Sequence, residues 1–284
     1  MNDRIAVIGA GQMGNGIAHV FAQSGFPVTI IDVSAAALAK GVATIEKNLD
    51  RQLKKGSIDA ATQSATLARI GTHTELAAVA ECTVIIEAAT ENVGLKFDIF
   101  SKLDALAADG SILASNTSSI SITQIAARTR RPEQVIGMHF MNPVPVMQLV
   151  EVIRGIATSD ATTERTVALA KAVGKTPCEA NDFPGFIANR ILMPMINEAF
   201  YCLMEGVGTA ESIDTVMKLG MNHPMGPLTL ADFIGLDTCV AILDVLHKGI
   251  GDPKYRACPL LRKYVDAGWL GRKSGRGVYT YATA

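Results

Sequence analysis

The amino-acid sequence predicts an α/β fold in which a doubly wound parallel sheet is followed by an all-helical C-terminal domain. In the first half of the chain, short apolar runs alternate with longer segments of helical periodicity, a pattern typical of parallel strands buried on both faces. After Pro177 this alternation gives way to long helical stretches. A chain of 284 residues has room for two domains of ordinary size. We therefore assign residues 1–182 to an α/β domain and residues 183–284 to an all-α domain.

Five apolar runs in the first domain are expected to be parallel strands. They are Ile5–Ile8, Val28–Ile31, Val84–Glu87, Ile112–Ser115 and Val135–His139. Since crossovers between parallel strands are right-handed, the helical segments between them should cover both faces of the sheet. The segment Ala35–Ile70 is too long for a single crossover, and Gly56 divides it. We expect residues 35–70 to form a helical hairpin that projects from the sheet.

The second domain is predicted to begin with a long apolar helix. Pro184 suits the first turn of this helix and Gly206 suits its end. Pro194 lies inside the pattern and is expected to kink the helix or open a turn. Because the segment is apolar nearly all round, it should be central to the second domain or half-buried against another subunit. A homodimer through this domain is the expected assembly.

A glycine-rich segment follows the first strand directly and opens a helix, which is the context of a dinucleotide-binding fingerprint. Its residues are Gly9, Ala10, Gly11, Gln12, Met13 and Gly14. Gly9 permits the tight turn, Gly11 lets the backbone approach a pyrophosphate, and Gly14 lets the helix pack against the strand. The helix N-terminus offers N–H groups to the phosphates. The first domain is therefore predicted to be of the Rossmann type, with these six residues as cofactor contacts.

The end of the second predicted strand favours NAD over NADP. Asp32 lies there, at the interval after the fingerprint where a carboxylate accepts hydrogen bonds from a ribose diol. The residues that follow, Val33–Ala36, contain no arginine that could bind a 2′-phosphate. We therefore expect NAD as the cofactor.

Polar residues end the last two predicted strands, at the edge of the sheet where ligands bind. Ser115–Ser119 ends one strand and His139 ends the next. Glu151 follows, and Pro143 and Pro145 favour an extended turn that could bring its carboxylate back to the imidazole. Such a contact fixes the tautomer of a histidine and favours the imidazolium. Beside a nicotinamide site, the pair suggests a general acid/base that moves a proton on and off a carbinol during hydride transfer.

Composition argues against several other classes of protein. The formal net charge of −1 does not suit a nucleic-acid surface, and no apolar run approaches the length of a membrane span. The N-terminal sequence enters a strand directly and lacks the pattern of a signal peptide. The five cysteines are widely spaced and the five histidines form no zinc motif. We expect a cytoplasmic, metal-free protein with reduced thiols.

Seven motifs occur in order from one end of the chain to the other. They are Gly9–Gly14, Glu87–Asn92, Ala114–Ser119, Gly137–Pro143, Pro184–Arg190, Asn222–Pro227 and Gly271–Gly277. Together they resemble the 3-hydroxyacyl-CoA dehydrogenase family, and most of all its bacterial 3-hydroxybutyryl-CoA members. One departure is Met141, where members often carry a second phenylalanine. The resemblance implies reversible NAD-dependent oxidation of short-chain (S)-3-hydroxyacyl-CoA thioesters to 3-oxoacyl-CoA.

The resemblance also assigns roles to individual residues. It implies that His139 is the base, that Glu151 is its partner, and that Ser118 and Asn189 form hydrogen bonds at the substrate. The cofactor contacts that it implies are Asp32, Glu91, Lys96, Ser118, Asn142 and Lys273. The role of Asn189 depends on the resemblance alone, because an asparagine in a helix is more often a cap or a solvated side chain.

The predicted hairpin carries cations that could bind the CoA substrate. Arg51 and Lys55 are four residues apart and so lie on one face of a helix. A nucleotide 3′-phosphate needs cations of this kind, and the resemblance places the CoA-contacting basic residues of the family in this hairpin. The alternative, a merely solvated helix face, stays open.

Two other functions are also considered. One is a dehydrogenase of the same architecture that acts on a free hydroxy acid or sugar acid, which would have no use for the hairpin cations. The other is a catalytically idle NAD-binding protein. An idle protein predicts loss of the catalytic set, yet Ser118, His139, Glu151 and Asn189 are all present.

Overall fold

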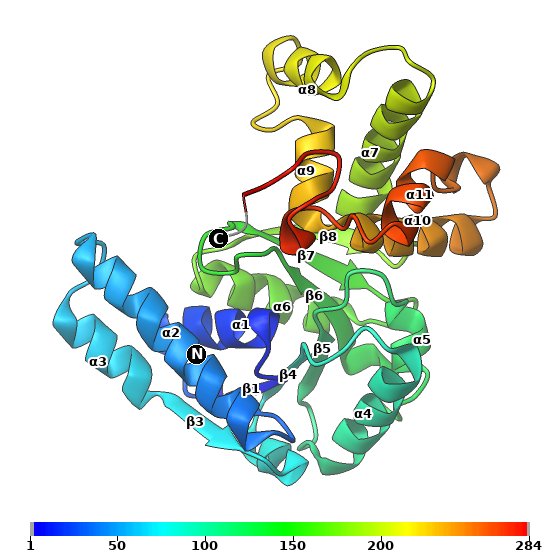
Figure 1. The fold of residues 1–284 in the computed structure, drawn as a ribbon. Helices are drawn as coiled ribbons and strands as arrows, with labels where there is room; N and C mark the ends of the chain where they lie inside the picture. Colours follow the sequence, from blue (N-terminus) through cyan, green and yellow to red (C-terminus); the bar gives the residue numbers. More distant parts are fainter. Residues whose placement is uncertain (1–2, 283–284) are drawn as a thin grey trace. The chain divides into compact units, whose positions relative to one another are not determined.

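The computed structural model describes residues 3–282. They form two compact units that are divided in sequence between Phe183 and Pro184. The first unit contains a sheet with helices on both of its faces, and the second unit is built from helices (Figure 1).

One eight-stranded sheet forms the centre of the first unit, with the strand order β3-β2-β1-β4-β5-β6-β7-β8. The strands are β1 (Ile5–Ile8), β2 (Val28–Ile31), β3 (Ile70–His73), β4 (Val84–Glu87), β5 (Ile112–Ser115), β6 (Val135–Phe140), β7 (Leu149–Arg154) and β8 (Thr176–Asn181). Neighbouring strands are parallel except for β6 and β7. The chain reverses its direction of travel across the sheet between β1 and β4, which is the point where doubly wound sheets bind ligands. The predicted fold class is confirmed.

Sequence reasoning missed three strands and one change of direction. The strands β3 and β8 lie at the two edges of the sheet and are largely exposed, so they lack the apolar runs that marked the buried strands. The strand β7 runs antiparallel to β6, which corrects the expectation of a parallel sheet throughout. Residues 141–148 separate the two strands, and so short a connection cannot hold a crossover helix.

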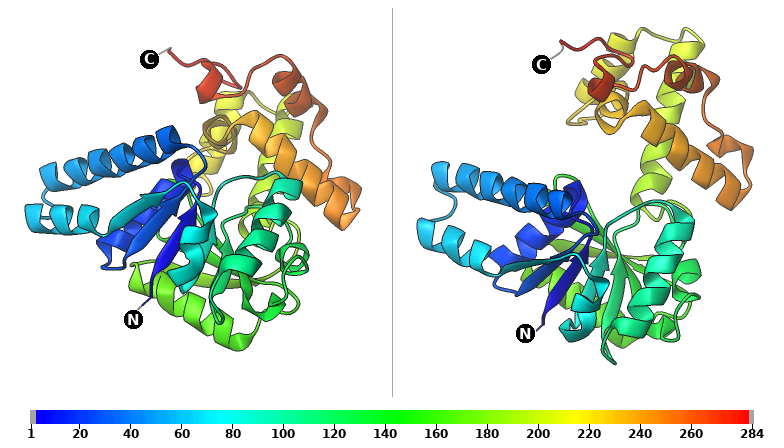
Figure 2. Two further views of the ribbon diagram at one scale, coloured as in Figure 1. Left: turned by 90° about the horizontal axis from the view of Figure 1, so that it is seen from below. Right: turned by 60° about the horizontal axis from the view of Figure 1, so that its bottom comes forward.

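Helices cover both faces of this sheet. They are α1 (Gln12–Gln23), α4 (Val93–Leu106), α5 (Ile122–Ala126) and α6 (Asp160–Ala172), with short 3-10 segments η1 (Leu76–Glu81) and η2 (Pro132–Gln134). The helices α1 and α6 lie on one face and α4 and α5 on the other (Figures 1 and 2). Phe21 of α1 and Leu169 of α6 belong to the same buried cluster as Val7 and Met138 of the sheet. The core on this face fixes α1 directly behind the glycine-rich segment.

Two further helices, α2 (Ala35–Lys54) and α3 (Ala60–Ala68), extend away from the sheet (Figure 1). The side chain of Ser34 caps α2 by accepting the Ala37 N–H at 3.2 Å. Ile45 and Leu49 are fully buried, whereas the face of α2 that turns away from them is polar. This amphipathic pattern holds α2 against the rest of the first unit while its outer face stays in water.

The second unit contains five helices among its described residues. They are α7 (Ala188–Met204), α8 (Ala210–Leu219), α9 (Pro227–Ile234), α10 (Leu236–Ile250) and α11 (Pro259–Asp266), with η3 (Pro253–Tyr255) and η4 (Arg272–Ser274). Their core includes the fully buried Phe200, Leu243 and Leu261. Two isolated β-bridges, which pair Arg276 with Gly271 and Thr280, are the only extended pairing described in this unit.

The first helix of this unit begins later than the sequence predicts. Gly185 and Phe186 have φ angles of 78° and 50°, and a right-handed helix cannot include such residues. The helix α7 therefore starts at Ala188 and not at Pro184. It continues without a break through Pro194, and Gly206, with a φ angle of 72°, lies just beyond its end.

Among residues 3–282 no helix combines the length and the apolar character that crossing a bilayer requires. Nor do the described residues contain a cluster of three or more His, Cys, Asp or Glu side chains suited to a metal ion. All five cysteines are free thiols.

Candidate active site

The glycine-rich segment turns the chain sharply from β1 into α1. Gly9 has a φ angle of 101°, and a Cβ atom there would lie 2.7 Å from the Cα atom of Ala89. A Cβ atom on Gly14 would lie 1.8 Å from the carbonyl oxygen of Gly9. A Cβ atom on Gly11, in contrast, would have no heavy atom within 4 Å. Gly9 and Gly14 are thus required by the packing of the protein itself, whereas Gly11 borders open space.

A crevice of about 530 Å³ opens beside this segment. Its walls come from the segment itself, from one face of α2 and from the turn after β6, and they include Gly11, Gln12, Lys40, Thr44, Asn48 and Asn142 to Pro145. Gly41 lets α2 approach closely, because a Cβ atom there would lie 2.9 Å from the carbonyl oxygen of Ala10. The volume is typical of a site for a cofactor or a small ligand. No described side chain caps the N-terminus of α1, so its N–H groups suit an anionic ligand.

Asp32, directly after β2, is hydrogen-bonded to the glycine-rich segment. Its Oδ2 atom accepts the Ala10 N–H at 2.9 Å, and its Oδ1 atom accepts the Ser34 N–H at 2.9 Å. Since each carboxylate oxygen has two lone pairs, both oxygens keep an acceptor position for a further donor such as a ribose hydroxyl. The carboxylate therefore shapes the segment and remains suited to the predicted contact.

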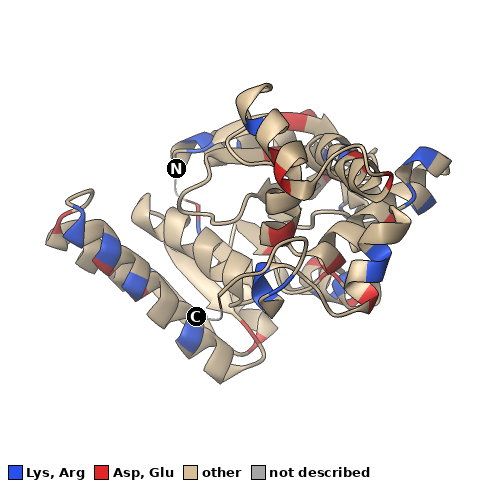
Figure 3. Cartoon of the chain, turned by 45° about the horizontal axis from the view of Figure 1, so that its top comes forward, with Lys and Arg blue, Asp and Glu red and all other residues tan. Residues whose placement is uncertain are grey.

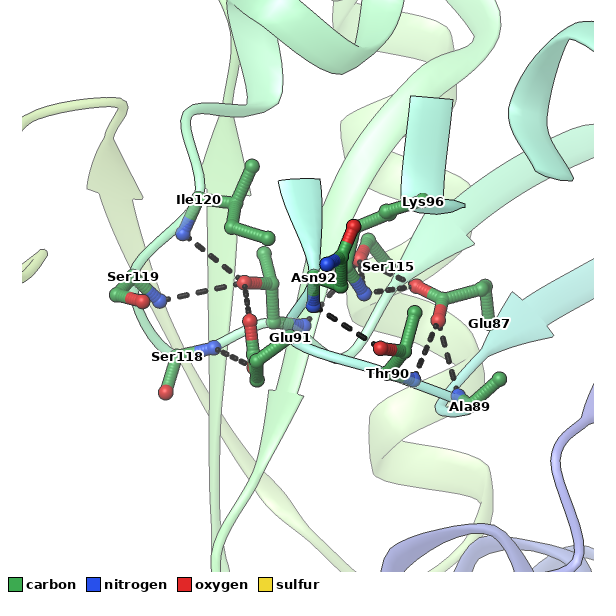
Figure 4. Close-up of polar contacts among 11 residues, drawn as sticks. Glu87, Ala89, Thr90, Glu91, Asn92, Lys96, Ser115, Ser118, Ser119 and Ile120 are labelled. Atoms are coloured by element: carbon green, nitrogen blue, oxygen red, sulfur yellow. Dashed lines mark hydrogen bonds and ion pairs between the residues drawn. The ribbon is translucent and has the colours of Figure 1, made fainter. Parts of the chain in front are cut away.

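Two loops at the carboxyl ends of β4 and β5 are joined by Glu91. Its Oε2 atom accepts the Thr117 hydroxyl at 2.8 Å, and its Oε1 atom accepts the Ser118 N–H at 3.0 Å (Figure 4). The Thr117 hydroxyl in turn accepts the N–H groups of Ser119 and Ile120 at 3.3 and 3.0 Å. The structure thus brings together two residues that the sequence analysis assigned to the cofactor, Glu91 and Ser118.

His139 and Glu151 face each other across the antiparallel pair β6 and β7. They are directly opposed in the strand register, and the His139 Nδ1 atom lies 2.8 Å from the Glu151 Oε2 atom. Both side chains are buried, with residue exposures of 8% and 2%. The contact predicted from the sequence is present, although a strand and not only a turn returns Glu151 to the imidazole. A buried carboxylate on Nδ1 leaves proton exchange with a ligand to the Nε2 atom.

Two further residues fix the surroundings of this pair. The Asn116 Oδ1 atom accepts the Phe140 N–H at 2.8 Å, which joins the loop after β5 to the end of β6. The Lys175 Nζ atom donates to the carbonyl oxygens of Val144 and Met147 at 2.6 and 2.7 Å. Burial lowers the pKa of Lys175 below its ordinary value. Sequence reasoning included Asn116 only as part of a motif, and nothing in the sequence distinguished Lys175 from a surface lysine.

The remaining predicted residues of the first unit lie in three different settings. The Gln12 Nε2 atom donates to the Asn142 Oδ1 atom at 3.0 Å, and both side chains are exposed at the crevice. Met13 is half-buried and packs against the core on the α1 side. Lys96 is 1% exposed and its ammonium group forms an ion pair with Glu87. The side chain of Lys96 is therefore enclosed by protein.

The two cations that the sequence analysis assigned to the CoA substrate, Arg51 and Lys55, are exposed. The Arg51 Nη1 atom donates to the Asn48 Oδ1 atom at 3.4 Å, and Asn48 also lines the crevice. Lys55 is the C-cap residue directly after the helix, which ends at Lys54. Acidic residues lie between the basic ones along α2 (Figure 3), and α3 carries no charged residue, so the hairpin has no continuous cationic surface. The contact with Asn48 nevertheless places Arg51 on the turn of α2 that adjoins the crevice.

Asn189 and Lys273 belong to the second unit. Asn189 is buried in the first turn of α7. Lys273 is in η4, and its Nζ atom donates to the Asp237 Oδ2 atom at 2.7 Å. Although burial acts in the opposite direction, the hydrogen bond from Lys273 helps to lower the pKa of Asp237 overall.

Comparisons with known proteins match the whole chain. The family model for the NAD binding domain of 3-hydroxyacyl-CoA dehydrogenase matches residues 4–183, and the model for the C-terminal domain matches residues 185–281. A probable 3-hydroxybutyryl-CoA dehydrogenase of Bacillus subtilis is 57% identical over 278 residues, which cover 98% of this chain and 97% of the relative. The mitochondrial hydroxyacyl-coenzyme A dehydrogenase of Homo sapiens is 43% identical, covering 98% of this chain and 90% of the relative. The crystal structure of (S)-3-hydroxybutyryl-CoA dehydrogenase from Ralstonia eutropha superimposes with a TM-score of 0.98 at 52% identity and covers all of both chains.

Proposed function

Because the chain belongs to the 3-hydroxyacyl-CoA dehydrogenase family, we propose that it catalyses the reversible NAD-dependent oxidation of (S)-3-hydroxyacyl-CoA to 3-oxoacyl-CoA. Short acyl chains, and 3-hydroxybutyryl-CoA above all, are the proposed substrates, in keeping with the names of the bacterial relatives. The observation that carries the proposal is the buried His139–Glu151 pair on a sheet that also forms a dinucleotide crevice.

The residues around the glycine-rich segment fit NAD. Gly9 and Gly14 leave no room for a side chain, so the turn is closed tightly, and Gly11 leaves open space where a pyrophosphate would approach. Asp32 is held at the end of β2 with acceptor positions for the ribose hydroxyls. We propose Gly9–Gly14, Asp32, Glu91, Ser118 and Asn142 as the residues of the first unit that hold the cofactor. When bound, NAD accepts the hydride that leaves the substrate C3 atom.

His139 acts in this proposal as the general base. With Glu151 on Nδ1, the imidazole presents Nε2 to the 3-hydroxyl and takes its proton as the hydride leaves. The Glu151 carboxylate then stabilises the imidazolium by an opposite charge within hydrogen-bond distance. In the reverse direction the same Nε2 atom returns the proton to the 3-oxo group. Burial of the pair strengthens this interaction, because little water screens it.

Ser118 and Asn189 are the proposed hydrogen-bonding groups for the reacting oxygen and the thioester carbonyl. Fixed donors of this kind hold the C3–H bond in a geometry suited to hydride transfer. Arg51 and Lys55 are proposed to bind the 3′-phosphate of CoA. The position of Arg51 against Asn48, which lines the crevice, supports this assignment. We propose Lys273 as a cofactor contact from the second unit.

We also propose that the protein acts in the cytoplasm as a homodimer that associates through its second unit. The support for a dimer is a set of exposed apolar side chains on and near α7 and α8. They are Ile191, Val207, Val216, Leu219 and Met221. Exposed apolar residues in such number are typical of an interface between subunits.

Oxidation of NADH, followed by its absorbance at 340 nm, tests the proposed reaction. The purified protein is given acetoacetyl-CoA in one assay and free acetoacetate in the other. We expect consumption of NADH with the thioester alone. Equal rates with the free acid would contradict the CoA assignment and favour a dehydrogenase of free hydroxy acids. No turnover with either would contradict the proposed reaction.

A further inference from the structure

Three polar side chains form a buried cluster behind the loops that carry Glu91 and Ser118. They are Glu87, Lys96 and Ser115, with residue exposures of 0%, 1% and 0%. Glu87 is the last residue of β4 and Ser115 the last residue of β5, while Lys96 comes from the first turns of α4. The sequence analysis had no role for Glu87 beyond its place in a motif.

The Glu87 carboxylate accepts hydrogen bonds on both of its oxygens (Figure 4). The Oε1 atom accepts the N–H groups of Ala89 and Thr90 at 2.9 and 3.3 Å. The Oε2 atom accepts the Ser115 hydroxyl at 3.0 Å and is paired with the Lys96 ammonium group. One oxygen therefore holds the loop after β4, and the other holds the end of β5.

The cluster supports three segments that follow the carboxyl ends of β1, β4 and β5, and the first of them, the glycine-rich segment, lines the crevice. The turn that Glu87 holds includes Ala89. The Cα atom of Ala89 lies so close to Gly9 that it excludes a side chain there. The Ser115 hydroxyl accepts the Thr117 N–H at 3.3 Å, and Thr117 donates to Glu91. The glycine-rich turn, the loop with Glu91 and the loop with Ser118 all depend on one carboxylate.

The burial of the Glu87 carboxylate and the Lys96 ammonium group also requires an explanation. Burying such charges costs free energy unless each has an opposite charge and hydrogen-bond partners. Charge-assisted hydrogen bonds are stronger and shorter than neutral ones, and in a buried site they fix geometry. Here the pair is placed at the carboxyl ends of β4 and β5. In a doubly wound sheet this side of the point where the strand order reverses takes the nicotinamide half of a dinucleotide, and the side of β2 takes the adenosine half.

We propose that Glu87 is a positioning residue that orders the nicotinamide half of the cofactor site, with Lys96 as its counter-charge and Ser115 as its link to the second loop. The inference rests on the proposed function, since that function makes this crevice a cofactor site. Glu87 acts through the two loops and contacts neither cofactor nor substrate. Lys96 serves the cofactor by neutralising Glu87.

Nucleotide binding to four variants tests this proposal, together with the unaltered protein. The variants are Glu87→Gln, Lys96→Met, the double variant Glu87→Gln/Lys96→Met, and Asp104→Asn as a matched control. Asp104 is also buried and ion-paired, with Arg131, but it lies toward the other end of α4. The Kd values for NADH and for ADP-ribose, which lacks the nicotinamide, are measured at a temperature where circular dichroism shows each variant folded.

We expect each single change at Glu87 or Lys96 to raise the Kd for NADH about tenfold, because each leaves one buried charge without its partner. The Kd for ADP-ribose should change by about twofold or less, since its contacts lie on the other half of the crevice. In the double variant no charge remains. The amide at position 87 keeps an oxygen for the loop N–H groups and can donate to Ser115, so the Kd for NADH should return to within about threefold of the original. Asp104→Asn should lower the melting temperature without changing the Kd for NADH.

Three results would overturn the proposal. If the single variants melt earlier but bind NADH as tightly as the unaltered protein, the cluster is only structural. If the double variant binds NADH as weakly as Lys96→Met alone, Lys96 acts on the cofactor directly and not through Glu87. Should a single variant fail to fold, Ser115→Ala provides the milder break, and an unchanged Kd for NADH in that variant would also contradict the proposal. Failure of the proposed reaction is distinguishable, because it would abolish turnover of acetoacetyl-CoA while leaving this pattern of nucleotide binding intact.

Discussion

The imidazole of His19 makes the stability of the first unit depend on pH. The residue lies in the middle of α1 with an exposure of 0%, and neither ring nitrogen has a hydrogen-bond partner within residues 3–282. Burial lowers the pKa of His19 from 6.5 to about 4, with a weak polar contact from Gln23 opposing the shift and the charge of Lys175 adding to it. The folded protein therefore holds His19 neutral, whereas the unfolded chain takes up a proton below pH 6.5.

The size of the effect follows from this difference in pKa. Because the folded state binds fewer protons, its stability is complete above pH 6.5 and declines as the pH falls toward 4. At about 1.4 kcal/mol per pKa unit, the full loss is about 3 kcal/mol, of which about 2 kcal/mol is lost by pH 5. That is a large part of the net stability of a typical domain.

Urea unfolding at pH 7 and at pH 5 measures this contribution. Other groups titrate in the same range, so two proteins are compared. For each, the free energy of unfolding at pH 5 is subtracted from that at pH 7, and the value for His19→Leu is then subtracted from the value for the unaltered protein. We expect a difference of about 2 kcal/mol. The control is His73→Gln, since His73 is exposed in the edge strand β3, and it should show the full fall of the unaltered protein. Equal falls with and without His19 would refute the argument, because they would mean that this imidazole is protonated in the folded state.

Three other changes test the site directly. His139→Ala should lower kcat with acetoacetyl-CoA by about 10² to 10⁴, the usual worth of a positioned base, with the Kd for NADH unchanged; full turnover would exclude His139 as the base. Gly11→Ala should raise the Kd for NADH about tenfold at an unchanged melting temperature, because the added methyl group meets only the space reserved for the pyrophosphate. Gly14→Ala, in contrast, should lower the melting temperature, because its methyl group meets the Gly9 carbonyl oxygen. Arg51→Glu/Lys55→Glu should raise the KM for acetoacetyl-CoA about tenfold and leave the Kd for NADH unchanged, as expected for a lost phosphate contact; a parallel loss of both affinities would indicate misfolding.

The buried strands could be predicted from the sequence because burial on both faces leaves a run of apolar residues. The observed bounds of β1, β2, β4 and β5 are those that the sequence predicts, and β6 is longer by one residue, Phe140. The edge strands gave no such signal. In β8, for example, Pro177 interrupts the run and most side chains face water, so its place in the sheet depends on pairing with β7 and not on local sequence.

The candidate site was predicted only where a residue type carries its own chemistry. A histidine at a strand end and glycines at a strand–helix turn stand out in a sequence, and the structure places His139 beside Glu151 and Gly9 against Ala89. Glu87 and Lys175 do not stand out, because their roles come from what the folded chain buries around them. A carboxylate at the end of a buried strand is the one sequence signal that could have identified Glu87.

One of the three strands that sequence reasoning missed, β7, carries the carboxylate of the proposed catalytic pair. In an antiparallel pair, directly opposed side chains lie on the same face with Cβ atoms about 5 Å apart, which is within reach of an imidazole–carboxylate hydrogen bond. A slip of one residue between β6 and β7 would turn Glu151 to the other face of the sheet. The register therefore has to be fixed by the turn that joins the two strands. Lys175 holds that turn at the carbonyl groups of Val144 and Met147, so the geometry of the proposed acid/base pair depends on a buried lysine outside both strands.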